Sequence, residues 1–368
     1  MRIQTPLPET ILNLGPEATK ARIAEIKELL GKKLAILGHH YQADDVLSFS
    51  DFKGDSLGLS HVAAECEGVE YIVFCGVHFM AESAAILSPP GRKVMIPNVL
   101  AGCPMADMAD ADDLETAMQE LFAMTDEKVV PVTYVNSTAA AKAVTGRHDG
   151  TCCTSGNAFE VFSSLLDPAQ GGAKKLLMSP DQHLGRNTAF AMGYDNDDCA
   201  VYDPSLPNGG LTPEQVDRAT FLLWKGHCYV HQRFQPKHVA AAREADPDAI
   251  IMVHPECDRS VVELCDRAGS TEQIIKALAA SEPGSHWVIG TEDHLVARLN
   301  DLYPDRIVTC LSPERPTCLQ MSQIELPYLL WVLEGIVSGE LVNLVSPAPE
   351  IVEEAKIAVS RMLEARPS

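Results

Sequence analysis

Three widely separated cysteines are spaced as metal ligands would be if each of three repeated structural units supplied one. Cys103 and Cys318 each stand 64 residues after a histidine, His39 and His254 respectively, and both histidines follow an apolar, strand-like run. Cys228 stands at the end of a third, longer interval of the same kind. Identical spacing around identical residue types indicates an internal repeat. The chain is therefore predicted to contain three related units.

The three cysteines indicate an incomplete metal shell. Structural zinc sites use four ligands, often in Cys-x-x-Cys pairs, and the sequence contains no such pair. Three thiolates suit a [4Fe–4S] cluster with one iron open to substrate, or a zinc ion with an open position. Thiolates do not suit magnesium. Cys310, eight residues before Cys318, is an alternative third ligand, and spacing alone does not separate iron–sulfur from zinc.

The chain has 11 cysteines. An odd number, scattered through a chain of enzyme size without a secretion signal, favours reduced thiols over a disulfide scaffold. Packing in the core is the prediction for four of them, Cys66, Cys75, Cys199 and Cys265. The adjacent Cys152 and Cys153 are predicted to be buried at a strand end rather than redox-active.

Hydroxyl-containing turns form a second recurring feature. The turns at 54–56, 154–157 and 269–271 lie 17, 21 and 16 residues after His39, Tyr134 and His254. Their hydroxyl side chains belong to Ser56, Ser155, Ser270 and Thr271. Helix capping is the simplest role for such residues, and a hydroxyl beside the amides of a helix start also binds carboxylate or phosphate.

Three histidines and one carboxylate lie at the polar ends of the repeated runs. His39, His231 and His254 occupy these positions, whereas the other histidines have surface or capping explanations. Glu256 is the best candidate for a general base, because a carboxylate in a strand-end loop near a metal can be poised to accept a proton.

Parallel α/β architecture is predicted from the elements that must position these residues. Short apolar runs rich in β-branched residues are separated by stretches with helical periodicity at 19–31, 113–124, 236–245 and 271–280. The successive apolar runs of each unit are predicted strands. They are 33–38, 71–76 and 93–98 in the first unit, 129–134, 175–181 and 226–231 in the second, and 249–253, 286–292 and 306–310 in the third. Ligands of open parallel sheets bind beyond the carboxyl ends of the strands, which is where the candidate residues fall.

The repeats divide the 368 residues into three predicted α/β domains, 1–110, 111–234 and 235–368. The middle domain carries an insertion near 193–213, rich in Asp, Asn, Pro and Gly, which is predicted to be an ordered surface loop. Residues 351–363 are predicted to form an amphipathic helix that closes a domain, and the C-terminal helices can pack back on the first repeat.

Composition narrows the setting of the protein. The formal net charge of −22 disfavours nucleic acid or an anionic membrane as a partner. The sequence has no N-terminal basic and apolar targeting segment and no apolar run of membrane-spanning length. A cytoplasmic location is therefore expected.

At these residues the sequence closely resembles the quinolinate synthase family, the A protein of bacterial NAD biosynthesis. The matching stretches follow the family's order over nearly the whole chain: HHYQ at 39–42, GDSL at 54–57, PN at 97–98, CPMA at 103–106, YVN at 134–136, TSGN at 154–157, PDQHLG at 180–185, HPEC at 254–257 and GST at 269–271.

The resemblance implies three α/β sandwich domains related by a pseudo-threefold axis, with a [4Fe–4S] cluster held at the centre by Cys103, Cys228 and Cys318. It also implies condensation of iminoaspartate with dihydroxyacetone phosphate to quinolinate, with release of phosphate and two waters, the open iron acting as a Lewis acid. Proton transfer is implied for Glu256, Tyr41 and His231. The implied substrate-binding residues are His39, Ser56, Tyr134, Asn136, Ser155, His254, Ser270 and Thr271. An aspartate oxidase or dehydrogenase is the expected metabolic neighbour.

Two other functions remain open from the residues alone. At least eight apolar runs end in polar tips, which also suits a zinc hydrolase built on an eight-stranded barrel. A non-catalytic iron–sulfur sensor or electron carrier is the second alternative, although electron carriers usually have four cysteine ligands.

Overall fold

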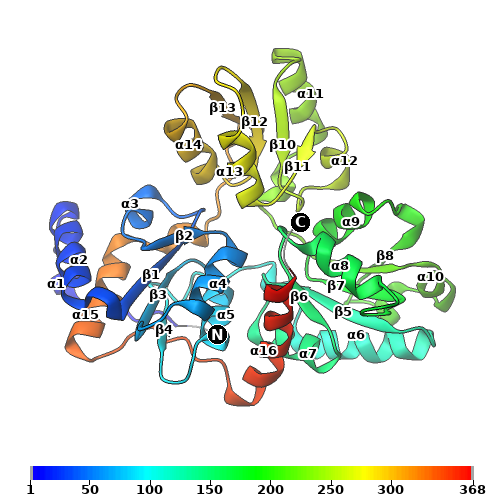
Figure 1. The fold of residues 1–368 in the computed structure, drawn as a ribbon, viewed down its shortest axis with the longest axis horizontal. Coiled ribbons are helices and arrows are strands. Elements are labelled where there is room, and N and C mark those ends of the chain that lie inside the picture. Colours follow the sequence, from blue (N-terminus) through cyan, green and yellow to red (C-terminus); the bar gives the residue numbers. More distant parts are fainter. Residues whose placement is uncertain (1–2, 366–368) are drawn as a thin grey trace. The chain divides into compact units, whose positions relative to one another are not determined.

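A computed structural model describes residues 3–365 of the chain. Its strands form three open, all-parallel sheets of four, five and four strands, which alternate with helices (Figure 1). The predicted parallel α/β fold class is confirmed, and the barrel alternative is wrong because no sheet closes on itself within these residues. Two compact units are present, Met1–Cys103 with Thr317–Ala348, and Pro104–Pro316 with Pro349–Ser368. The division into three domains stays a prediction.

The first sheet lies in the first unit. Its strand order is β2 (Phe52–Gly54), β1 (Leu34–His39), β3 (Tyr71–Cys75), β4 (Lys93–Met95). All six residues of β1 are buried, as expected for a strand with helices on both faces. The helices of this unit are α1 (Glu9–Leu12), α2 (Pro16–Leu30), α3 (Asp44–Leu47), α4 (Ser56–Glu65), α5 (His78–Leu87) and α15 (Leu326–Ser338). Helix α15 packs against α2 and β3.

The middle sheet lies in the second unit and has one strand more. Its order is β6 (Thr151–Cys153), β5 (Val129–Tyr134), β7 (Lys175–Ser179), β9 (Phe221–Trp224), β8 (Cys199–Tyr202). The helices around it are α6 (Ala111–Met124), α7 (Ala139–Arg147), α8 (Ala158–Leu166), α9 (Gln182–Ala191) and α10 (Pro213–Arg218). One strand prediction is wrong here: residues 226–231 form a loop and the start of a 3₁₀ helix. The strand is the fully buried apolar run just before it, β9.

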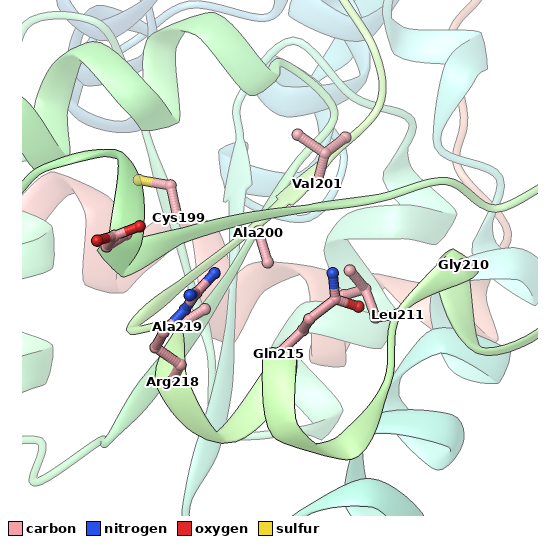
Figure 2. A pocket seen from close by; sticks show the side chains of 9 residues that line it. Cys199, Ala200, Val201, Gly210, Leu211, Gln215, Arg218 and Ala219 are labelled. Atoms are coloured by element: carbon pink, nitrogen blue, oxygen red, sulfur yellow. The ribbon is translucent and has the colours of Figure 1, made fainter.

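The insertion contributes structure of its own. Residues 193–213 contain the edge strand β8 with a short 3₁₀ helix on each side, so the expected surface loop is in part a fifth strand. Beside β8 and α10 lies a hollow of about 330 Å³. Figure 2 shows Cys199, Gln215 and Arg218 around it.

The third sheet repeats the plan of the first. Its order is β11 (Arg267–Ala268), β10 (Ile250–Val253), β12 (His286–Gly290), β13 (Ile307–Cys310), with α11 (Pro236–Ala245), α12 (Arg259–Val262), α13 (Thr271–Ala279) and α14 (Asp293–Leu302) as its helices. The same aspartate-to-strand bond occurs in both sheets: Asp51 accepts from Ile36 N at 2.8 Å and Asp266 accepts from Ile251 N at 2.7 Å. The predicted repeat is therefore visible in side-chain detail.

The predicted C-terminal helix is present as α16 (Pro349–Glu364) and packs against α7 and β6 (Figure 1). The approach to α7 is close: a Cβ on Gly146 would lie 2.0 Å from the carbonyl oxygen of Glu354. Only glycine fits at that crossing. Among residues 3–365, no helix is long and apolar enough to cross a membrane.

Candidate active site

The three candidate cysteines share one local setting. Each stands three residues before a three-residue 3₁₀ helix and eight residues before an α-helix. The three series are Cys103, η2 (Ala106–Met108) and α6; Cys228, η5 (His231–Arg233) and α11; Cys318, η6 (Met321–Gln323) and α15. The first residue of each 3₁₀ helix is buried, which fixes the turn that follows the cysteine. A recurring turn of this kind supports equivalent roles for the three thiols.

The shared turn separates Cys318 from its rival. Cys310 is the last residue of β13, where it pairs with Ile289, and burial raises the pKa of its thiol to about 11. Burial likewise raises the pKa of Cys75 and of Cys152 to about 12. Cys310 is partly buried, as are Cys103, Cys228 and Cys318, but those three lie in loops, whereas Cys310 ends a strand. Three thiols that share this turn fit the donor set of a cluster with one iron left open.

A second interaction fixes the Cys228 loop. Gln182 N donates to Gly226 O at 3.0 Å, and a Cβ on Gly226 would lie 2.2 Å from Pro180 O. The carboxylate of Asp181 accepts hydrogen bonds from the backbone of His183, Leu184 and Cys228. The stretch at 180–185 therefore holds the backbone of this cysteine loop.

His231 and Glu256 form a buried pair next to Cys228. His231 Nε2 lies 3.3 Å from Glu256 Oε2, and both side chains are almost fully buried. Ligand atoms of Cys228, His231 and Glu256 lie within 4.8 Å of one another. The His231 ring stacks on the His254 ring, with centroids 4.4 Å apart and planes inclined by 13°. Four residues predicted from the sequence, Cys228, His231, His254 and Glu256, thus meet in the second unit.

Burial sets the protonation of this pair. It lowers the pKa of His231 to about 3 and, together with the neighbouring His231, lowers that of His254 well below its usual range. Burial raises the pKa of Glu256 to about 7, against hydrogen bonds from Tyr134 and Cys228 that lower it. The His231–Glu256 contact is therefore one between a neutral imidazole and a carboxyl group that can hold or release a proton near neutral pH, not a fixed ion pair.

The turn that carries Ser155 extends the site. Ser155 Oγ lies 3.1 Å from His254 Nε2. The next residue, Gly156, packs close to Ser270: a Cβ added to this glycine would lie 3.4 Å from Ser270 Oγ. Ser270 is the N-cap of α13 and accepts from Gln273 N at 3.3 Å, so the capping role holds for this residue. Thr271 is the buried first residue of the same helix. These hydroxyls gather around the His254 ring and the start of α13.

The Ser155 turn is fastened to the C-terminal helix by Asn157. Asn157 Oδ1 accepts from Thr154 N at 2.8 Å and from Thr154 Oγ1 at 3.1 Å. Asn157 Nδ2 donates to Met362 O and to Ala365 O, both at 3.0 Å. The side chain is fully buried. One amide therefore joins the hydroxyl turn to the end of α16.

Tyr134 and Asn136 come from the end of β5 in the same unit. Tyr134 is buried and hydrogen-bonds to the Glu256 carboxylate. Asn136 Oδ1 is buried without a hydrogen-bond partner among the described residues. A buried amide oxygen that lacks a protein partner suits a contact with bound ligand.

The remaining predicted residues lie in the first unit. His39 is the buried last residue of β1, and its Nδ1 accepts from Tyr41 N at 3.1 Å while the two rings meet edge to face at 4.7 Å. Ser56 is the first residue of α4, whose N-cap is Asp55 rather than Ser56. Within this unit the chain after His39 contacts the Cys318 turn, because Gln42 Nε2 donates to Met321 Sδ at 3.2 Å.

Sequence reasoning missed the residues that support the site. The sequence motifs contain Asp181 and Asn157 but assign neither a supporting role. Asn187 and Gln232, which bond the backbone around Glu256, lie outside every predicted site. The sequence signal for Asp181 is an acidic residue two positions after a buried strand, whereas the amides of Asn187 and Gln232 have no such signal.

Comparison with known proteins gives one consistent result. Residues 21–364 match the model of the NadA family, described as quinolinate synthetase A protein. Curated proteins named quinolinate synthase from Bacillus cereus strain Q1, B. cereus strain ATCC 14579 and Bacillus anthracis strain CDC 684 are each 46% identical over 365 residues, 98% of this chain and 97% of the relative. The chain belongs to the quinolinate synthetase A protein family.

Proposed function

We propose that this chain is a quinolinate synthase that condenses iminoaspartate with dihydroxyacetone phosphate and releases phosphate and two waters. Identity of 46% along almost the full length of curated quinolinate synthases carries this conclusion. The site geometry supports it, since a reaction that removes two waters and forms an aromatic ring needs several proton transfers, and Glu256 has a pKa near 7.

A [4Fe–4S] cluster on Cys103, Cys228 and Cys318 is the proposed cofactor. The matching turns that precede three helix starts support this ligand set and favour Cys318 over Cys310. When bound, a cluster with one iron not held by protein supplies a Lewis acid that helps an oxygen leave the substrate. The thiol of Cys228 lies beside Glu256, so the proton-transfer group and one cluster ligand belong to the same site.

Proton transfer is assigned to Glu256, His231 and Tyr41. The neutral His231 ring faces Glu256 Oε2 with its Nε2 across 3.3 Å, where it can donate a hydrogen bond to the carboxylate or accept one from the protonated acid. Tyr41 follows His39 in the first unit and offers a phenol as donor. Burial of His231 and Glu256 keeps bulk water away from the exchanged protons.

Substrate anions are assigned to hydroxyl, amide and imidazole groups of the predicted site residues. A net charge of −22 gives no general attraction for a phosphate or a dicarboxylate, so fixed local donors must hold them. The helix starts at Ser56 and Thr271 offer amide groups. The other proposed contacts are His39, Tyr134, Asn136, Ser155, His254 and Ser270.

Metal and sulfide analysis on anaerobically purified protein, combined with a quinolinate assay, tests the proposal. About four irons and four sulfides per chain are expected, with quinolinate formed from the two substrates. Active protein that contains zinc without sulfide would overturn the cofactor. Protein with an intact cluster that makes no quinolinate would overturn the function. Because the imine substrate is generated by oxidation of aspartate, an aspartate-oxidising enzyme is the expected source.

Glu256→Gln probes the assigned base. The substitution keeps the shape of the side chain and removes its titration, so turnover should fall by roughly 10²-fold or more while iron content is unchanged. Near-normal turnover in an iron-replete variant would remove Glu256 from the proton-transfer path.

A further inference from the structure

Three consecutive backbone carbonyls around Glu256 are held by two side-chain amides. Asn187 Nδ2 donates to Pro255 O and to Cys257 O, both at 2.8 Å. Gln232 Nε2 donates to the carbonyl between them, that of Glu256, at 3.2 Å. The backbone on both sides of the proposed base is thus tied to side chains of two other elements.

The two amides reach the turn from two separate elements of the same unit. Asn187 lies in α9, which begins directly after Asp181. Gln232 lies in the 3₁₀ helix η5 next to His231, and its own backbone N–H donates to Cys228 O at 3.1 Å. The two amides therefore connect the turn that contains Glu256 to helix α9 and to the turn that carries Cys228 and His231.

The orientation of the Asn187 amide is fixed by its surroundings. Asn187 is 6% exposed, and a flip of the amide would place Oδ1 against two carbonyl oxygens. Its Oδ1 has no hydrogen-bond partner among the described residues, so nothing there favours the flipped state. A buried amide with one unsatisfied oxygen is costly. The cost of the unsatisfied Oδ1 is offset here because both N–H groups of the amide donate hydrogen bonds to one short turn.

We propose that Asn187 and Gln232 are positioning residues that set the direction of the Glu256 carboxyl toward His231. This inference rests on the proposed function, in which Glu256 transfers protons. The Glu256 side chain leaves a backbone whose neighbouring carbonyls cannot rotate without breaking two or three hydrogen bonds. The 3.3 Å contact between Oε2 and His231 Nε2 depends on that backbone.

The primary variant is Asn187→Leu, which preserves size and removes both donors without adding charge. Misplacement of a proton-transfer group by about 1 Å can cost on the order of 10²-fold in rate. We therefore expect kcat to fall by roughly 10- to 100-fold with KM changed much less, and with iron and sulfide content unchanged. Gln232→Met removes the single central bond and should give a smaller loss of the same kind. Asn300→Leu, at an exposed position on α14, is the matched control.

A double-mutant cycle with Glu256→Gln separates positioning from general structure. If Asn187 acts through Glu256, Asn187→Leu should lower kcat in the wild-type background and have almost no further effect in the Glu256→Gln background. Equal losses in both backgrounds would overturn the proposal, as would an unchanged kcat in an iron-replete Asn187→Leu protein. If Asn187→Leu fails to fold or to assemble the cluster, the same cycle is run with Gln232→Met, and the same outcomes decide. Failure of the wild-type protein to form quinolinate would instead refute the proposed function.

Discussion

The join between the Ser155 turn and the C-terminal helix can be tested at one atom. Asn157→Asp keeps an oxygen that can accept from Thr154 N and Thr154 Oγ1. It replaces the amide that donates to Met362 O and Ala365 O by a second oxygen. The substitution therefore breaks the connection to α16 and leaves the connection within the turn.

The size of the effect follows from the two lost bonds. Loss of one buried hydrogen bond costs about 1–3 kcal/mol when the remaining partner is left unsatisfied. Met362 is fully buried, whereas Ala365, just after α16, is partly exposed. We expect local opening of the end of α16 to become easier by about 2–4 kcal/mol. That change corresponds to roughly 30- to 1,000-fold faster amide exchange if this end opens independently.

Hydrogen exchange measured by mass spectrometry on a peptide from α16 is the direct assay, with exposed Asn300→Asp as the control for an added charge. Because Asn157 also orders the turn that places Ser155 at 3.1 Å from His254, the KM for one substrate should rise several-fold while cluster content stays constant. Unchanged protection of α16 would refute the account of Asn157. Faster exchange with unchanged KM would show that the helix end does not influence the Ser155 turn.

Three further outcomes follow from the structure. Cys318→Ser should abolish assembly of a complete cluster, measured as iron and sulfide content, whereas Cys310→Ser should leave it nearly intact; the reverse result would transfer the ligand role. Gly146→Ala places a methyl group 2.0 Å from Glu354 O, so α16 must shift and the melting temperature should fall measurably. Arg147 holds the pKa of Glu354 below its usual range through a hydrogen bond. Because the carboxylate pKa is lowered in the folded state, the interaction stabilises that state at pH values above the usual carboxyl pKa of 4.5. This stabilisation is lost as the pH falls through the pKa of Glu354 in the folded protein. The stability difference between wild type and Arg147→Ala should therefore shrink as the pH falls below 4.5; a difference that persists in acid would contradict the ion-pair explanation.

Helices and central strands of the fold were predictable because their hydrophobic patterns are long and continuous. The predicted helix at 236–245 is α11, and the apolar run at 129–134 is β5, residue for residue. Edge strands of two or three residues, such as β11 and β6, carry too few residues for a pattern to emerge. The error at 226–231 has a similar cause, since a short loop that contains valine, tyrosine and cysteine has the composition of a strand.

The residues at the polar ends of strands were predictable, and the residues that hold them were not. His254 and Glu256 follow a buried strand, which is where ligands of a parallel sheet bind. Asn157 and Asn187 act through backbone carbonyls far away in the sequence. Nothing in the local sequence of an asparagine reveals which carbonyl it will meet, so only the fold identifies such supports.

The repeats explain how one scaffold carries different chemistry. His39 and His254 occupy matching strand ends, and each Nδ1 accepts from the backbone N–H two residues later, at 3.1 Å and 3.3 Å. That second residue is Tyr41 in the first repeat and Glu256 in the third. The same backbone geometry thus presents a phenol in one place and a buried carboxyl with a pKa near 7 in the other. Duplication supplies equivalent positions, and substitution at those positions supplies the proposed donor, Tyr41, and the proposed base, Glu256.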